Sequence, residues 1–263
     1  MKRPSVLNRA LLASVRTFNQ NPWTSGHLEL VPSGARFELL PKEDGPFYAE
    51  DGLWTHHGHS FVDDDRFQRA YERAVSAGGF DYRIRWRVHT LLWAASTAAS
   101  VDGAFVECGT GRGFMASAVC EYLGWEDRPF YLFDTFDGTT LDTTDARAAG
   151  VSPYYATSVD EVRENFARWP GTRLVVGKLP ASLSRAPDQV AFLHVDLNHP
   201  SPEQMVVRHF WPRMAEGAVL VFDDYGFGGY ESSRRAADEV SDELGFSILA
   251  SPTGQGIVVK TKS

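Results

Sequence analysis

The chain has 263 residues, of which 43% are hydrophobic and 13% aromatic, and its formal charge is -8 at pH 7. Such a chain has enough apolar side chains for a packed globular core. The acidic balance, with no basic stripe along the sequence, argues against nucleic acid as the main substrate, because phosphate backbones are held by clustered Lys and Arg. A neutral or cationic small molecule fits this charge better.

Residues 1–60 are expected to form an appendage, with the rest of the chain as the main domain. Residues 5–18 have an amphipathic helical stripe, which favours a helix packed on its own domain or across a dimer. Residues 20–60 are rich in Pro and Gly and predict loops with short strands. We therefore expect a homo-oligomer, with a dimer through this arm as one form.

Three histidines, His56, His57 and His59, fall within four residues of this appendage. They could hold a metal ion, but a zinc site needs further ligands at suitable spacing and no cysteine lies nearby. A second interpretation is a loop that lends His57 to a substrate pocket as an acid or base. A third is that the histidines have no catalytic role.

The two cysteines, Cys108 and Cys120, lie near a predicted strand and on the helix that follows it. We expect both to pack in the core, which indicates a reducing compartment rather than a disulfide framework. Polar residues interrupt the apolar N-terminal segment, and nothing resembles a membrane span. These features predict a cytoplasmic protein.

Periodicity predicts helices over residues 63–77, with Asp63 as a cap, and over residues 82–99. Residues 104–113 then combine a short apolar strand, the acid Glu107 and a glycine-rich turn, and an apolar helical segment follows over 114–122. Glycines permit a tight turn and let a ligand approach the N-terminus of the helix closely.

The spacing of the glycines in that turn distinguishes between two possible ligands. Dinucleotide folds prefer Gly-x-Gly-x-x-Gly, which places a pyrophosphate on the helix dipole. Here the glycines are Gly109, Gly111 and Gly113, and the carboxylate of Glu107 would repel a pyrophosphate. S-adenosylmethionine has a sulfonium, an ammonium and no phosphate, so it fits better, with a dinucleotide as the alternative.

Strands and helices alternate through the rest of the chain. The expected strands are 129–134, 174–177, 190–196, 217–224, 246–250 and 256–260; the expected helices are 158–169, one that Ser201 caps and Gln204 supports, and 230–244. The last two strands must be antiparallel, because the link between them is too short for a parallel crossover. This pattern predicts an α/β, Rossmann-like, seven-stranded methyltransferase sheet, mostly parallel and flanked by helices. Residues 135–157 would form a mobile lid over the site or, alternatively, a plain long loop.

Four of these strands end in acids. A ligand of an open parallel sheet binds at the carboxyl ends of the strands, where Glu107 and Asp134 would face the donor and Asp134 would reach a ribose. Asp196, Asp223 and Asp224 converge if the fourth and fifth strands are neighbours, and three uncompensated carboxylates would repel one another. A magnesium ion resolves this repulsion. The alternative is that the three acids only cap their own turns.

Four motifs together resemble the macrocin and mycinamicin sugar O-methyltransferase family, from about Phe61 to the C-terminus. They are Val-Glu-Cys-Gly-x-Gly-Arg-Gly at 106–113, Leu-Phe-Asp-Thr-Phe-Asp-Gly at 132–138, His-Val-Asp-Leu-Asn at 194–198 and Phe-Asp-Asp-Tyr-Gly at 222–226. The resemblance implies an enzyme that uses S-adenosylmethionine and Mg²⁺ to methylate a sugar hydroxyl. It places Glu107, Gly109, Gly111, Asp134 and Thr135 at the donor, to which we add Gly113 and Gly177, and Asp196, Asp223 and Asp224 at the metal.

The chain departs from this family at one position. The family's fourth-strand motif has a second acid, assigned as the base, where this chain has Asn198. An amide cannot accept a proton at neutral pH. Either His199 or one of the three appendage histidines, with His57 as the choice among them, substitutes as the base, or the metal alone lowers the hydroxyl pKa. The predicted catalytic residues are therefore Asp196, Asn198, His199 and His57.

The sequence thus predicts a Mg²⁺-dependent sugar O-methyltransferase domain over residues 61–263. A metal-dependent methyltransferase that acts on a catechol or another phenol is the nearest alternative. A nicotinamide-dependent oxidoreductase and a relative that binds S-adenosylmethionine without catalysis are further alternatives, the last because of Asn198.

Overall fold

The computed structural model describes residues 28–33, 36–41, 48–55, 57–138 and 157–262. The chain divides into two compact units, Met1–Ser60 and Phe61–Ser263, and each is described by itself. The helix expected over residues 5–18 and most of the lid expected over 135–157 lie outside the described residues.

The N-terminal unit contains two antiparallel hairpins. Strand β1 (Leu28–Ser33) pairs with β2 (Arg36–Pro41), and β3 (Tyr48–Glu50) pairs with β4 (Leu53–Thr55). The short strands expected in this Pro- and Gly-rich region are therefore confirmed.

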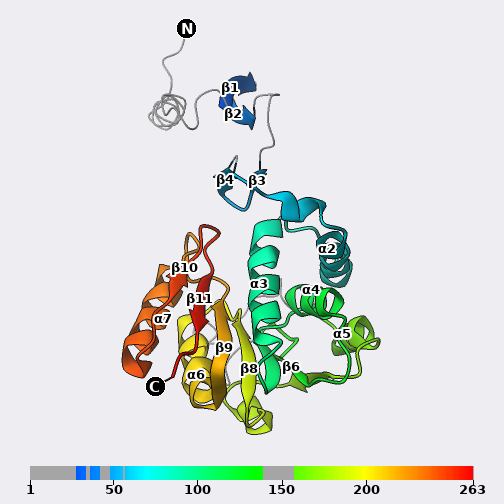
Figure 1. Cartoon of the computed structure of the whole chain (residues 1–263), viewed down its shortest axis with the longest axis vertical. Helices are drawn as coiled ribbons and strands as arrows, with labels where there is room; N and C mark the ends of the chain where they lie inside the picture. The colour runs from blue at the N-terminus through cyan, green and yellow to red at the C-terminus, as the bar shows by residue number, and fades with distance from the viewer. Residues whose placement is uncertain (1–27, 34–35, 42–47, 56, 139–156, 263) are drawn as a thin grey trace. The chain divides into compact units, whose positions relative to one another are not determined.

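The C-terminal unit is built on one seven-stranded sheet in the order β10-β11-β9-β8-β5-β6-β7 (Figure 1). Its strands are β5 (Ala104–Cys108), β6 (Phe130–Asp134), β7 (Thr172–Val176), β8 (Val190–Val195), β9 (Met214–Phe222), β10 (Leu249–Ala250) and β11 (Gly256–Val259). The pairs among β5 to β9 are parallel, whereas β11 is antiparallel to both β9 and β10. The predicted fold class and the reversed final strand are confirmed.

Helices cover both faces of this sheet (Figure 1). They are α2 (Asp65–Gly78), α3 (Arg85–Ala98), α4 (Phe114–Leu123), α5 (Val159–Phe166), α6 (Pro200–Phe210) and α7 (Glu231–Leu244), with short 3-10 turns η1 (Ser60–Asp63), η3 (Ala181–Arg185) and η4 (Trp211–Arg213). Successive strand residues point to opposite faces. Phe105 accordingly packs with α2, α3, α4 and α5, whereas Val106 packs with α6 and α7.

Two predicted helix starts are wrong in detail. Asp64, not Asp63, caps α2, because its Oδ1 accepts from the backbone N of Phe67 at 2.8 Å while Asp63 belongs to the preceding turn η1. Helix α6 begins at Pro200, so Ser201 and Gln204 lie too late to cap it. The backbone N of His199 donates instead to Oε1 of Glu203 at 3.2 Å.

Other local predictions hold. Ser158 caps α5, as its hydroxyl accepts from the backbone N of Asp160 at 3.2 Å and of Glu161 at 3.5 Å. Cys108 and Cys120 are both buried and free. In the described part of the chain, no helix combines the length and the apolar character needed to cross a lipid bilayer.

Candidate active site

The glycine-rich turn between β5 and α4 is shaped by packing inside the protein. A Cβ at Gly109 would lie 1.7 Å from the carbonyl oxygen of Asp196, and a Cβ at Gly113 would lie 2.4 Å from the ring of Phe166. A Cβ at Gly111, by contrast, would have no neighbour within 4 Å. Gly111 is therefore the one of the three glycines that faces open space, where a ligand can approach the backbone.

Asp134, at the end of β6, fixes this turn. Its Oδ2 accepts from the backbone N of Gly111 at 2.7 Å, and its Oδ1 accepts from the backbone N of Phe136 at 2.7 Å. Burial raises the pKa of Asp134, and these backbone donors oppose that rise. The backbone N of Gly177 donates to the carbonyl of Asp134 at 2.9 Å, which places Gly177 beside the same turn. The backbone N of Thr135 is a third donor to the Asp134 carboxylate, whose two oxygens together have about four acceptor sites, so one site remains for a ligand.

Glu107 lies deeper than the sequence suggested. The expectation that its strand ends at this acid is wrong, because β5 continues to Cys108 and Glu107 is only 1% exposed on the sheet face. Burial raises the pKa of Glu107. Its Oε2 has no hydrogen-bond partner among the described residues. This oxygen lies 3.5 Å from Nδ1 of His194, so Glu107 supplies buried negative charge next to the glycine-rich turn rather than an oxygen that is free to contact a ligand.

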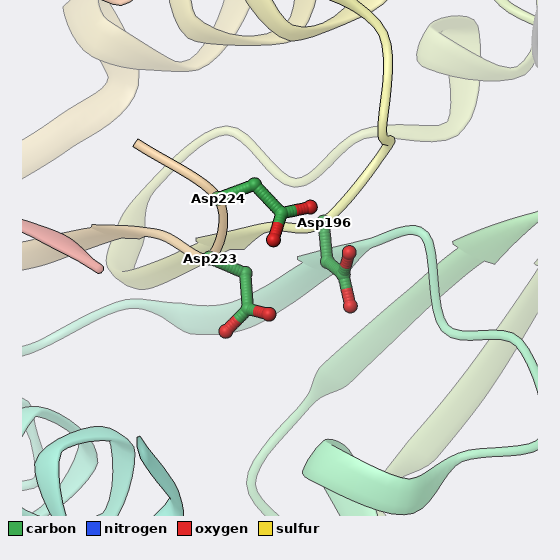
Figure 2. A group of neighbouring side chains, drawn as sticks. All are labelled: Asp196, Asp223 and Asp224. Atoms are coloured by element: carbon green, nitrogen blue, oxygen red, sulfur yellow. The ribbon is translucent and has the colours of Figure 1, made fainter. Parts of the chain in front are cut away.

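Asp196, Asp223 and Asp224 come together at the carboxyl ends of the neighbouring strands β8 and β9 (Figure 2). One oxygen from each of the three carboxylates lies within 4.8 Å of the others. Strand β9 ends at Phe222, so the chain has already turned when it reaches the two adjacent acids. This turn lets side chains that would alternate within a strand face one point.

Arg87, in the first turn of α3, is a buried cation beside this cluster. Its Nη1 lies 2.7 Å from Oδ2 of Asp223 and 3.4 Å from Oδ1 of Asp224, and its Nη2 donates to the carbonyl of Thr253 at 3.3 Å. Sequence reasoning missed Arg87. One sequence feature could have indicated that Arg87 is buried: it lies four residues before Leu91, on the apolar face of the predicted helix.

His194 lies fully buried in β8 between two acids. Its Nδ1 is 3.5 Å from Oε2 of Glu107 and its Nε2 is 3.5 Å from Oδ1 of Asp223, both longer than an ordinary hydrogen bond. Burial alone would lower the pKa of His194, but the two carboxylates outweigh it and raise that pKa to about 10. Gln255 also donates to Oδ1 of Asp223, at 2.9 Å. These contacts were not predicted from the sequence.

The three clustered acids differ in their ionisation. Burial would raise the pKa of Asp223, but Arg87 and His194 beside it hold that pKa well below its usual range. Burial and the charge of Asp223 raise the pKa of Asp224 to about 6. Burial and the charges of Asp223 and Asp224 also raise the pKa of Asp196. Arg87 and His194 therefore compensate the charge of Asp223 well and that of Asp196 poorly. A divalent cation, which prefers oxygen ligands, would compensate the negative charge that remains on the cluster.

Three of the four predicted catalytic residues lie at this edge of the sheet. Asn198 has φ 56°, and its Nδ2 donates to Oδ1 of Asp196 at 3.0 Å. His199 is the N-cap of α6, and its Nδ1 is buried without a hydrogen-bond partner in the described chain. His57 belongs to the N-terminal unit, where its backbone N donates to Oγ1 of Thr55, so its catalytic role stays a prediction.

A further acid of this region, Glu203 on α6, was also missed. It is 6% exposed, and burial raises its pKa to about 7. In the structure, Oε1 of Glu203 accepts a hydrogen bond from the backbone N of His199.

Residues 106–225 match a family model described as a methyltransferase domain. No curated protein sequence matches the chain at a significant level. The matched residues run from the middle of β5 to the turn after β9, and so contain the glycine-rich turn and all three clustered acids.

Several solved structures are similar in fold. The O-methyltransferase NovP has a TM-score of 0.58 and 20% identity over 72% of this chain and 88% of its own. CalS11, a calicheamicin methyltransferase, has a TM-score of 0.54 and 15% identity over 83% and 99%; its apo structure is described as a TDP-rhamnose 3'-O-methyltransferase. A putative caffeoyl-CoA O-methyltransferase from Staphylococcus aureus has a TM-score of 0.53 and 10% identity over 76% and 95%.

The domain match and the seven-stranded sheet define the class of this protein. It is an S-adenosylmethionine-dependent methyltransferase enzyme. The alternative of a nicotinamide-dependent oxidoreductase is therefore not supported, because both the matched domain and the reversed strand β11 are those of methyltransferases.

Proposed function

We propose that the protein transfers a methyl group from S-adenosylmethionine to a hydroxyl of a sugar or glycoside, with Mg²⁺ bound at Asp196, Asp223 and Asp224. The convergence of these three carboxylates, within 4.8 Å of one another, is the observation that carries the proposal. The description of CalS11 as a TDP-rhamnose methyltransferase supports the sugar as acceptor.

The donor side of the site consists of the glycine-rich turn and two acids. Gly111 offers open backbone, and Asp134 keeps a lone pair for a ribose. Glu107 adds a buried carboxyl next to this turn, which suits a cationic donor better than a pyrophosphate. Gly109 brings this turn against the backbone of Asp196, so that donor and acceptor are held close together. Close, oriented placement of two reactants can contribute much of the rate enhancement.

The acceptor side consists of the acid cluster. A divalent cation held there would polarise a sugar hydroxyl and lower its pKa. Arg87 and His194 keep Asp223 ionised, and Asn198 orients Asp196 toward the same point. Asp196 and His199 are the groups here that can accept the hydroxyl proton, because the amide of Asn198 cannot.

Calorimetry and a methyl-transfer assay test this proposal. We expect S-adenosylhomocysteine to bind the full chain, Mg²⁺ to bind separately, and transfer to TDP-rhamnose or methyl α-L-rhamnopyranoside to stop with EDTA and return with Mg²⁺. Asp223→Ala should abolish metal-dependent turnover and leave binding of S-adenosylhomocysteine largely intact. Full activity of the wild-type enzyme in EDTA would exclude the metal role.

A phenol or catechol acceptor is the second candidate, and the similarity in fold to the putative caffeoyl-CoA O-methyltransferase favours it. The same three acids would then face an aromatic diol. Competition between catechol and the rhamnoside in one assay separates the two. Binding of S-adenosylhomocysteine without transfer to either would favour a relative that binds the donor without catalysis. Self-association through residues 5–18 and a cytoplasmic location stay predictions.

A further inference from the structure

Phe227 is an exposed aromatic ring directly beside the acid cluster. It lies three residues after Asp224, and its side chain is 39% exposed. The guanidinium carbon of Arg87 lies 4.8 Å from the centre of its ring, and the same guanidinium contacts Asp223 and Asp224. One contact therefore links the exposed ring to the proposed metal ligands.

The turn that carries Phe227 is held by its surroundings. The backbone N of Phe227 donates to the carbonyl of Asp224 at 3.3 Å, and the backbone N of Tyr230 donates to the carbonyl of Phe227 at 3.1 Å. The backbone N of Gly226 donates to the carbonyl of Gly254 at 2.6 Å. A Cβ at Gly254 would lie 2.9 Å from the backbone N of Phe227, so the link between β10 and β11 packs tightly on this turn. The backbone that carries the ring is thus held in place by contacts within the protein.

The backbone that follows Phe227 is not covered by the rest of the described chain, which leaves space beside the ring. A Cβ at Gly228 or at Gly229 would have no neighbour within 4 Å. The ring of Tyr230 lies 6.0 Å from that of Phe227 at an interplanar angle of 61°, so the two rings form an edge-to-face pair rather than a closed stack. An exposed, fixed aromatic ring with open backbone beside it is a suitable surface for one flat face of a small ligand.

We propose that Phe227 is a specificity-determining residue that stacks on the C–H face of the acceptor's pyranose ring while a neighbouring hydroxyl reaches the acid cluster. This inference rests on the proposed function and adds the residue that recognises the sugar. The face of an aromatic ring carries partial negative charge and attracts the weakly positive C–H groups of a sugar face. The sugar hydroxyls, which lie around the ring's edge, stay free for the acids and for water.

Exposure alone does not single out Phe227, because scattered exposed apolar residues are normal on protein surfaces. Trp93, for example, is 49% exposed on α3. Phe227 differs because its ring contacts Arg87, which contacts two of the clustered acids. Trp93 therefore provides the matched control, an exposed aromatic residue two turns further along the helix that carries Arg87.

The experiment compares Phe227→Ala, Phe227→Leu, Phe227→Trp and the control Trp93→Ala in the full chain, with saturating S-adenosylmethionine and Mg²⁺. TDP-rhamnose, methyl α-L-rhamnopyranoside and catechol serve as acceptors. For the sugar that the wild type methylates, Phe227→Ala should raise KM by about tenfold, the loss expected for one stacking partner. Phe227→Leu should raise it similarly, since it keeps apolar area but has no ring face, whereas Phe227→Trp should stay within about twofold of the wild type.

Binding of S-adenosylhomocysteine, measured by calorimetry, should be unchanged in every Phe227 variant. Phe227→Trp keeps a ring face for Arg87, so it should also keep the Mg²⁺ affinity and the melting temperature of the wild type. A KM for the sugar that is unchanged in Phe227→Ala, or changed equally in Trp93→Ala, would overturn the inference while the proposed function stands. A wild type that methylates only catechol, or no acceptor, would instead overturn the proposed function and this inference with it.

Discussion

The side-chain amide of Asn198 donates a hydrogen bond to Oδ1 of Asp196 at 3.0 Å. A carboxylate at position 198 could not donate in this way when ionised. The amide therefore suits an orienting role, in which it fixes one oxygen of Asp196 and leaves the other for a ligand.

We expect Asn198→Ala to weaken Mg²⁺ binding by about tenfold, which is typical when the partner that orients a metal ligand is lost. Calorimetric titration of Mg²⁺ at neutral pH measures this directly. Binding of S-adenosylhomocysteine should stay the same, as a control for correct folding. An unchanged Mg²⁺ affinity would show that Asn198 does not orient the ligand.

Asp223 and Asp196 should affect stability in opposite directions when EDTA removes divalent metal. Asp223→Asn leaves Arg87 and His194 as buried cations without their main acid, so we expect a loss of about 3 kcal/mol in the free energy of unfolding. Asp196→Asn removes a charge that its neighbours repel, so we expect a small gain instead of a loss. Urea unfolding of both variants at pH 7.5 checks this. A similar loss in both would contradict the charge distribution described here.

Metal binding should depend on pH through Asp224. Its pKa is raised to about 6, so the carboxyl is largely protonated at pH 5 and ionised at pH 7. Because the folded pKa lies above the ordinary value of an Asp, stability in EDTA should fall as pH rises from about 4 to about 6. Mg²⁺ affinity should rise over pH 5 to 7, and Asp224→Asn should flatten that rise. Calorimetry at three pH values gives the measurement.

His194 should make the protein less stable at alkaline pH. Its folded pKa of about 10 lies above the ordinary value, so its contribution is complete below about pH 6.5 and is lost as pH rises toward 10. His194→Gln should therefore cost a few kcal/mol in the free energy of unfolding at pH 7 and much less at pH 10. His209→Gln is the control, because burial lowers the pKa of His209 and its effect should be constant over this range.

The fold was predictable from the sequence because its signals are local. The apolar strands, the glycine turn and the capping serine at Ser158 each depend on neighbouring residues, and the short final link forces β10 and β11 to be antiparallel. The convergence of Asp196 with the Asp223 and Asp224 pair followed from one condition, that β8 and β9 are neighbours, which the structure meets.

What the sequence could not show depends on packing between distant segments. Arg87 lies 136 residues before Asp223, and Gln255 lies 32 residues after it, so neither contact has a local pattern. Glu107 was placed too near the rim because a strand boundary one residue further along changes how deep its side chain lies. Helix α6 began earlier than expected because Pro200 itself takes the first helical position.

Gly109 has a consequence for any attempt to redesign this enzyme. Since a Cβ at Gly109 would lie 1.7 Å from the carbonyl oxygen of Asp196, the glycine-rich turn and the loop that carries Asp196 are packed directly against each other. A side chain as small as a methyl group at this position would push the two apart. Grafting a different donor turn onto the scaffold would thus disturb the acceptor half as well, and the two halves must be exchanged together.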